Sequence, residues 1–263
     1  MENVVLRTNA IPVYGFLSTI VARQSRDGTS PRGKAFSQGN ALQRGKALPR
    51  GKVLDCGAGG PVPPLALFHQ HGFEGWGIDT SEGQLEKTRG FCQEQGIELH
   101  LRKGDMRRMP FEDESFDYVY EHYSMCHLSK RDTVVAISEM YRVLKAGGLC
   151  FLGVISTDSW PKSFYGEERE PGEYWMEEGG HGLTRHSMFT DTEADGLVSA
   201  WEIVSKEKHS TYLRETAGET SLEEWRDLYQ EGEGYSLEEW QARYEDRGNA
   251  FQYAHLFYIL RKP

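Results

Sequence analysis

The sequence predicts a doubly wound α/β fold, in which a mostly parallel sheet carries helices on both faces. From residue 52 onward, short apolar runs alternate with helix-like stretches, as in parallel strands joined by crossover helices. The first apolar run enters a glycine-rich turn at residues 57–60, and the next run ends in a carboxylate, Asp79. In such folds ligands bind beyond the carboxyl ends of the strands, where the strand order reverses. Both observations therefore predict a small-molecule site at that edge.

The individual elements follow from hydrophobic periodicity and from residues that start or stop helices. Residues 11–22 have the pattern of an amphipathic helix ahead of the sheet. A helix is expected at 131–145, because its apolar residues, Val134 and Val135 among them, recur mostly on one face and Gly147-Gly148 follows as a stop. Two more helices are expected near 62–71 and 81–95. Seven strands are expected, at 52–56, 74–79, 97–102, 116–121, 148–155, 200–212 and 252–261.

The chain is expected to divide into an N-terminal segment and one large domain. Residues 1–50 would form a helix and a basic, Gly/Ser-rich linker, together a candidate lid. Residues 51–263 would form the ligand-binding domain, with helical or irregular cap insertions at 156–199 and 215–250. The second insertion carries Ser-Leu-Glu-Glu-Trp twice, at 221–225 and 236–240, a capping-box pattern that predicts two short helices.

Composition limits the classes of partner. The net charge is −10, and residues 161–250 hold 22 acids against nine bases, which disfavours nucleic acid as the substrate. No apolar run approaches the ~18 residues that cross a bilayer, so no membrane span is expected. The four cysteines form no Cys-x-x-Cys pair and fit a reducing compartment, which predicts a cytoplasmic protein. The sequence does not predict the oligomeric state.

The glycine turn favours one class of adenosine ligand over another. Counted from Gly57, the third glycine of a dinucleotide-binding G-x-G-x-x-G turn would fall at Val62, so a pyrophosphate contact is disfavoured. Asp55, just before the turn, would repel a pyrophosphate but suits the ammonium and sulfonium of S-adenosylmethionine. Asp79 would accept the hydroxyls of a ribose. The alternative that Asp55 only caps the turn stays open.

Four blocks between residues 53 and 148 resemble, in order, the motifs of the class I S-adenosylmethionine-dependent methyltransferases. They are most similar to the small-molecule branch that includes the ubiquinone and menaquinone methyltransferases. Two departures are Gly60, one position earlier than the family's third glycine, and Ala146 in place of a common proline. The resemblance implies a Rossmann-like methyltransferase fold whose seventh strand is antiparallel. The first block is 53–60 and the second is 77–81. The third comprises 104–106, 109–111 and 115–119, and the fourth comprises 126–128 and 139–148.

The resemblance also implies roles for residues at the predicted strand ends. Asp55 would hold the cofactor's ammonium, Asp79 the ribose hydroxyls and Asp105 the adenine amino group. Met106 would cover the adenine ring, and Glu121 would lie where the methionine end of the cofactor meets the substrate. The full predicted cofactor set is Asp55, Cys56, Gly57, Ala58, Gly59, Asp79, Thr80, Gly104, Asp105, Met106 and Glu121.

The implied activity is transfer of a methyl group from S-adenosylmethionine to a small-molecule acceptor, with S-adenosylhomocysteine as the product. Oxygen or nitrogen is slightly favoured as the accepting atom. The reaction depends mainly on alignment of the reacting groups, and a base is needed only if the acceptor arrives protonated. The candidate catalytic residues are Glu121, His122, Tyr123 and His127. His122 is the favoured base, because His127 matches a histidine of the family pattern that we expect to be structural. The histidines lack a ligand spacing, so no metal is expected.

Three alternatives belong to other functional classes. The chain would be a sensor or assembly module if it bound the cofactor without methylating anything. A nicotinamide-dependent oxidoreductase is disfavoured by the glycine spacing. The alternative of a macromolecular methyltransferase is favoured only by the basic N-terminal segment.

Overall fold

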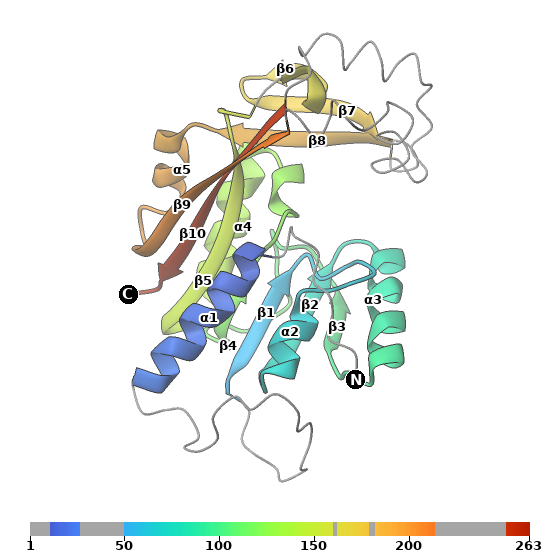
Figure 1. Ribbon diagram of the computed structural model, residues 1–263, viewed down its shortest axis with the longest axis vertical. Helices are drawn as coiled ribbons and strands as arrows, with labels where there is room; N and C mark the ends of the chain where they lie inside the picture. Colours follow the sequence, from blue (N-terminus) through green and yellow to red (C-terminus); the bar gives the residue numbers. More distant parts are fainter. Residues whose placement is uncertain (1–10, 27–49, 160–161, 179–181, 214–250) are drawn as a thin grey trace. The chain divides into compact units, whose positions relative to one another are not determined.

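The computed structural model describes residues 11–26, 50–159, 162–178, 182–213 and 251–263 (Figure 1). The two short helices predicted within 215–250, and most of the predicted N-terminal linker, lie outside the described residues. The chain divides into two compact units. We call the first, residues 1–122, 139–151 and 261–263, the glycine-turn unit, and the second, residues 123–138 and 152–260, the meander unit.

Parallel strands in the order β3-β2-β1-β4-β5 form the sheet of the glycine-turn unit. The strand order therefore reverses between β1 and β4, beside the glycine turn that follows β1. This confirms the predicted doubly wound sheet. The strands are β1 (Lys52–Cys56), β2 (Glu74–Asp79), β3 (His100–Lys103), β4 (Phe116–Tyr120) and β5 (Leu144–Ser156), of which residues 144–151 belong to this unit.

Helices α1 (Ile11–Arg26) and α2 (Leu65–Gln70) pack on one face of this sheet (Figure 1). Phe16 of α1 contacts the rings of Phe68, Tyr120 and Phe151, with centroids 5.7 to 6.5 Å apart. α3 (Glu82–Gln95) packs on β2 and β3. These helices lie where the sequence predicted them. Among the described helices, none has the length and apolar character to cross a membrane.

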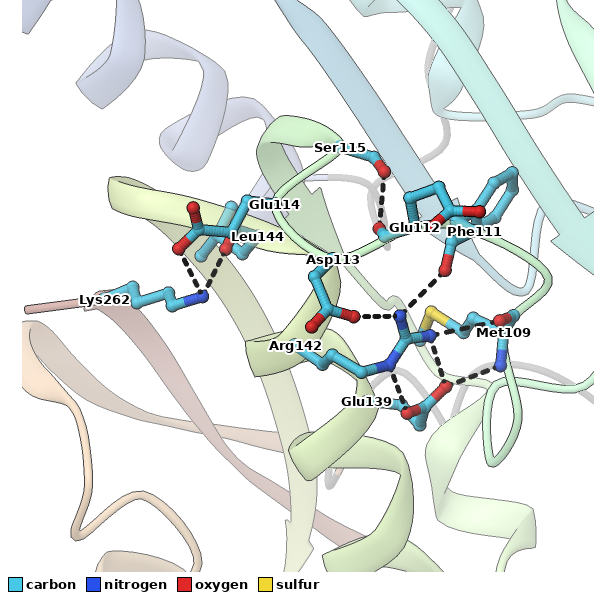
Figure 2. Close-up of polar contacts among 10 residues, drawn as sticks. All are labelled: Met109, Phe111, Glu112, Asp113, Glu114, Ser115, Glu139, Arg142, Leu144 and Lys262. Carbon is cyan, nitrogen blue, oxygen red and sulfur yellow. Dashed lines mark hydrogen bonds and ion pairs between the residues drawn. The ribbon is translucent and has the colours of Figure 1, made fainter.

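An ion-pair network fastens the loop before β4 to the last turn of α4 (Lys130–Val143) (Figure 2). The Arg142 guanidinium donates to the carbonyl oxygens of Phe111 at 2.8 Å and Met109 at 3.1 Å, and it pairs with Asp113 at 2.8 Å. It also contacts the Glu139 carboxylate, Nε to Oε1 at 2.7 Å, and that carboxylate accepts from the Met109 amide at 2.8 Å. We call these contacts the Arg142 network. It joins two of the sequence blocks that carried the resemblance.

The buried face of α4 differs from its prediction. Val134 and Val135 are 52% and 42% exposed. The two valines are adjacent, and both fall between members of a buried stripe with helical spacing, so they point outward. That stripe consists of Thr133, Ala136, Ile137 and Met140. The predicted stop also differs, because the helix ends at residue 143 and Gly147 belongs to β5, where its amide donates to the carbonyl oxygen of Lys262 at 2.8 Å.

In the meander unit, antiparallel strands run through part of the segment predicted as an irregular cap. β6 (Glu167–Glu170) pairs with β7 (Glu173–Glu178), and β7 pairs with β8 (Gly182–Phe189). β8 in turn pairs in parallel with the distal end of β5, at Ile155↔Met188 and Ser156↔Phe189. These three strands add to the seven predicted ones. The unit also holds η2 (Met125–His127), η3 (Lys162–Tyr165), α5 (Asp191–Leu197), β9 (Glu202–Leu213) and most of β10 (Phe251–Arg261), which pairs with β9.

Candidate functional site

The glycine turn follows β1 and is held against the end of β2. The amides of Gly57 and Ala58 both donate to the carbonyl oxygen of Ile78 at 2.9 Å. Gly57 and Gly60 have φ values of 126° and 137°, a region that favours glycine. A Cβ atom at Gly60 would meet nothing within 4 Å. The turn thus presents bare backbone to open space, as a ligand cradle requires.

Asp79 is held at the tip of β2 by backbone amides. Its Oδ2 accepts from the Gly59 amide at 3.0 Å, and its Oδ1 accepts from the Ser81 amide at 2.8 Å. A Cβ atom at Gly59 would lie 2.5 Å from Asp79 Oδ2, so only glycine allows this approach. An ionised carboxylate has about four lone-pair sites, of which these amides use two. Asp79 can therefore still accept two hydroxyl groups of a ligand.

Two buried acids lie at the tips of β1 and β4. Asp55 is 2% exposed and Glu121 0%, and the Tyr120 hydroxyl donates to Asp55 Oδ2 at 2.6 Å. Burial raises the pKa of Asp55 to about 7, although the hydrogen bond from Tyr120 lowers it, and the charges of Glu121 and Asp79 raise it further. Among the described residues, no cationic side chain enters this balance. A bound cation would offset both burial and mutual repulsion.

Tyr120 and Thr88 are site residues that sequence reasoning missed. Tyr120 faces Asp55 because the two residues are register partners in the parallel β1–β4 pair. The buried Thr88 hydroxyl lies 2.8 Å from the carbonyl oxygen of Ala58 and 3.0 Å from that of Gly60, and so braces the glycine turn from α3. The alternation of apolar runs predicts that the ends of β1 and β4 lie side by side, and this alignment could have identified Tyr120 as a neighbour of Asp55. Thr88 has no sequence signal of that kind.

The predicted adenine acceptor Asp105 is engaged by a third missed residue, Arg107. Arg107 donates to Asp105 Oδ1 from its amide at 2.8 Å and to Oδ2 from Nη2 at 2.6 Å, and these contacts lower the pKa of Asp105. The Gly104 amide donates to the carbonyl oxygen of Asp79 at 3.0 Å, which brings this turn beside the tip of β2. Thr80 is exposed. The roles assigned to Asp105, Met106 and Thr80 stay predictions.

The candidate catalytic residues fall into both units. Glu121 and His122 belong to the glycine-turn unit, where the Glu121 amide donates to the carbonyl oxygen of Phe151 at 3.1 Å. Tyr123 belongs to the meander unit and has a φ of 61°, rare for a residue with a side chain. Its ring lies 5.0 Å from that of His255.

His127, also in the meander unit, is positioned by contacts with β8. Its Nδ1 lies 3.0 Å from the carbonyl oxygen of Arg185, and its ring lies 5.1 Å from that of His186. Burial and the neighbouring His127 lower the pKa of His186 to about 4. In the part of the chain that the structure describes, no group of three ligating side chains gathers as a metal site would require. The charges of Glu121 and Asp79 both act on Asp55, although the three carboxylates do not gather closely enough to form such a group. The base assignment stays a prediction.

The chain is similar to methyltransferases over the segment that holds the predicted cofactor residues. A family described as a methyltransferase domain matches residues 53–148. A sterol 24-C-methyltransferase of Pneumocystis carinii is 30% identical over 161 residues, 59% of this chain and 40% of that protein. A sarcosine/dimethylglycine N-methyltransferase of Aphanothece halophytica is 36% identical over 112 residues, 41% of this chain and 40% of that protein. The chain thus spans less than half the length of these curated relatives.

Solved structures resemble the chain over a longer stretch. A putative methyltransferase from Bacillus halodurans matches with a TM-score of 0.58 and 21% identity, covering 81% of this chain and 93% of that one. A protein from Pyrococcus horikoshii matches with a TM-score of 0.54 and 18% identity over 94% of this chain and 91% of that one. At these identities the likeness concerns the fold.

Proposed function

We propose that the protein transfers a methyl group from S-adenosylmethionine to a small-molecule acceptor, because residues 53–148 match a family described as a methyltransferase domain and the chain is similar in sequence to curated methyltransferases. S-adenosylhomocysteine would be the second product. The proposal includes a cytoplasmic location, in line with the four free thiols among the described residues.

The observation that carries the proposal is the buried pair Asp55 and Glu121. A pKa of about 7 means that Asp55 is only partly ionised near neutral pH in the cofactor-free protein. A ligand that brings positive charge to this place gains from both carboxylates, whereas an anionic pyrophosphate would be repelled. S-adenosylmethionine has an ammonium and a sulfonium, so the acids fit its methionine end.

The other end of the cofactor fits the remaining features of the turn. Asp79 retains lone pairs for the two ribose hydroxyls, and the glycine turn offers backbone without side chains. When bound, the cofactor supplies a methyl group on a positively charged sulfur. The residues of this chain would bind and orient it, and alignment of this kind contributes about 7–11 kcal/mol to such reactions.

The acceptor is proposed only as a class. The two curated relatives are named for a sterol carbon and for an amine nitrogen, so the family name alone fixes no accepting atom. We propose oxygen or nitrogen in a small molecule, with His122 as the base if the acceptor arrives protonated and Glu121, Tyr123 or His127 as further candidates. The acidic net charge of −10 supports a small molecule over nucleic acid.

Calorimetric titration of the purified protein with S-adenosylhomocysteine, NAD and NADP tests the cofactor. We expect saturable binding of S-adenosylhomocysteine that neither NAD nor NADP displaces, weakened about tenfold or more in Asp79→Asn, because that change removes the charge that accepts ribose hydroxyls. Glu86→Gln, an exposed carboxylate on α3, is the matched control and should bind normally. Binding of NAD instead of the nucleoside would contradict the proposal.

Methyl transfer itself is tested with S-adenosylmethionine labelled in its methyl group and a metabolite extract. We expect label in a small-molecule product that depends on the enzyme and is reduced in Asp79→Asn when the cofactor is below saturation. Label in protein or RNA alone would favour the macromolecular alternative. Tight cofactor binding without any labelled product would favour the sensor.

A further inference from the structure

A pocket of about 500 Å³ opens at the amino-terminal edge of the sheet, where β1, β4 and β5 begin. All its lining residues belong to the glycine-turn unit. β1 runs five residues from this edge to the glycine turn, a length of about 16 Å at 3.3 Å per residue. The pocket is therefore distinct from the candidate cofactor site.

Among the charged side chains of the pocket lining, cations outnumber anions. Arg23, Arg50 and Lys145 contribute positive charge, and Asp117 contributes the one negative charge. Both oxygens of Asp117 are engaged, Oδ1 by the Lys145 ammonium at 2.7 Å and Oδ2 by the Lys52 amide at 2.8 Å. No described carboxylate forms an ion pair with Arg50, which is half-buried. The lining carries a net charge of about +2 in a protein whose net charge is −10.

Hydrogen bonds and glycines hold this pocket in shape. Gln24 Nε2 donates to the carbonyl oxygen of Arg50 at 2.8 Å and to the Tyr118 hydroxyl at 3.1 Å, which joins the end of α1 to the starts of β1 and β4. Gly51 has a φ of 128°, and a Cβ atom there would lie 3.1 Å from Asp117 Oδ2. Because these contacts use the backbone of Arg50, its guanidinium is not required for them.

The dipole of α1 opposes the binding of an anion, but its effect is smaller than that of the positive charge of the pocket. Arg23 lies near the C-terminal end of α1, where the helix dipole contributes roughly −0.5 of a charge. That is about a quarter of the net +2, so the pocket still favours an anion. Guanidinium groups match the oxygens of phosphate in paired, charge-assisted hydrogen bonds. The volume is within the ~300–1,000 Å³ of small-molecule sites, which leaves room for an organic body beside one phosphate.

We propose that this pocket binds a phosphate-bearing small molecule, at a second site independent of methyl transfer. The phosphate would meet Arg50, and the charges of Arg23 and Lys145 would add to the attraction. The proposal stands whether or not the glycine turn binds S-adenosylmethionine, because the two sites share no residue.

Calorimetric titration with inorganic phosphate, pyrophosphate and acetate at constant ionic strength tests the site. Saturating S-adenosylhomocysteine is present in one series and absent in another, so that phosphate binding at the glycine turn is distinguished from phosphate binding at this pocket. We expect saturable binding of phosphate and pyrophosphate in both series and much weaker binding of acetate. When the titrations are repeated at a higher salt concentration, the affinity for phosphate should fall. Pyrophosphate affinity should fall about tenfold in Arg50→Gln and further in the Arg23→Gln/Arg50→Gln double variant.

Lys87→Gln removes one exposed positive charge from α3 and is the matched control, which should bind pyrophosphate as the wild type does. Thermal unfolding of each variant checks that the fold is kept, and Arg50→Gln alone tests the site if the double variant is unstable. Absence of saturable phosphate binding, equal binding of acetate, or undiminished affinity in Arg50→Gln would overturn the proposal.

Discussion

Two carboxylates of the glycine-turn unit, Asp55 and Glu139, lie in opposite electrostatic environments. The Arg142 guanidinium contacts Glu139 at 2.7 Å and lowers the pKa of that carboxyl. Asp55 is more deeply buried, beside the Tyr120 phenol and the acid Glu121, and its pKa is raised to about 7. The fold thus supplies a cation where the carboxylate holds a loop in place, whereas among the described residues no cationic side chain acts on Asp55. A carboxylate left in that state marks a place where a ligand completes the balance of charge.

Removing the cation of the Arg142 network should have the largest effect on stability. Arg142→Met deletes contacts to two carbonyl oxygens and two carboxylates while keeping an apolar stem of similar length. We expect a loss of about 3 kcal/mol in the free energy of unfolding, because several partners are left unsatisfied together. Urea denaturation followed by circular dichroism measures it.

Arg89→Met is the control for that loss. Arg89 pairs with Glu82 at 2.6 Å, a contact as short as those of Arg142, but both side chains are more than 40% exposed. An exposed pair contributes roughly 0–1 kcal/mol, so this variant should be almost as stable as the wild type. Equal losses in both variants would mean that the Arg142 network is no stronger than a surface ion pair.

Removing the charge of Asp55 should affect binding and spare stability. Asn keeps an acceptor for the Tyr120 hydroxyl, so the hydrogen bond at 2.6 Å can be retained. We expect Asp55→Asn to bind S-adenosylhomocysteine about thirtyfold more weakly, which corresponds to about 2 kcal/mol, and to unfold at or above the wild-type urea concentration at pH 8. Calorimetry gives the first value and urea denaturation the second. An unchanged affinity would return Asp55 to the role of a turn cap.

The pH dependence of stability should have opposite signs in the two regions. Asp55 has a raised pKa in the folded state, so its stabilising contribution is full below about pH 4 and is lost as the pH rises through about 7. Between pH 6 and pH 8 the loss should be about 1.4 kcal/mol for a pKa near 7. Glu139 has a lowered pKa, so its contribution is present above its unfolded pKa and is lost on acidification.

Unfolding of the wild type and Asp55→Asn at pH 6 and pH 8, without cofactor, measures the pH-dependent contribution of Asp55 to stability. The wild type should lose stability relative to the variant between the two values. Parallel behaviour of the two proteins would mean that Asp55 is ionised throughout, and that its environment holds a compensating charge. Glu139→Gln serves as the comparison, since its difference from the wild type should stay constant over this pH interval.

The sequence predicted the parts of the site that local spacing determines. Gly57, Gly59 and Asp79 follow from a strand, a turn and the next strand end, and Asp79 does meet the Gly59 amide. Arg107 was missed because a surface ion pair two residues from Asp105 leaves no distinctive pattern. Thr88 was missed for a different reason, since its contact with the turn joins residues 30 apart.

In the meander unit, β6 escaped prediction for a physical reason. All four residues of β6 are exposed and all are charged, so the strand has no apolar alternation and rests on backbone pairing with β7. α4 shows the converse error. Its apolar residues were predicted to lie mostly on one face, but Val134 and Val135 fall between the members of the buried stripe and are exposed.

The smallest expected effect concerns how the glycine turn is kept ready for its ligand. Thr88→Val keeps the shape of the side chain but leaves the carbonyl oxygens of Ala58 and Gly60 without its hydroxyl. A single neutral hydrogen bond contributes about 1 kcal/mol, so we expect a loss of that size in stability and a roughly threefold weaker affinity for S-adenosylhomocysteine. Thr88→Ser keeps the hydroxyl and should retain the affinity. If both variants bind S-adenosylhomocysteine equally well, the hydrogen bonds from the Gly57 and Ala58 amides to the carbonyl oxygen of Ile78 suffice to hold the turn. The conformation that binds the ligand then depends on the backbone and the acids of this region alone.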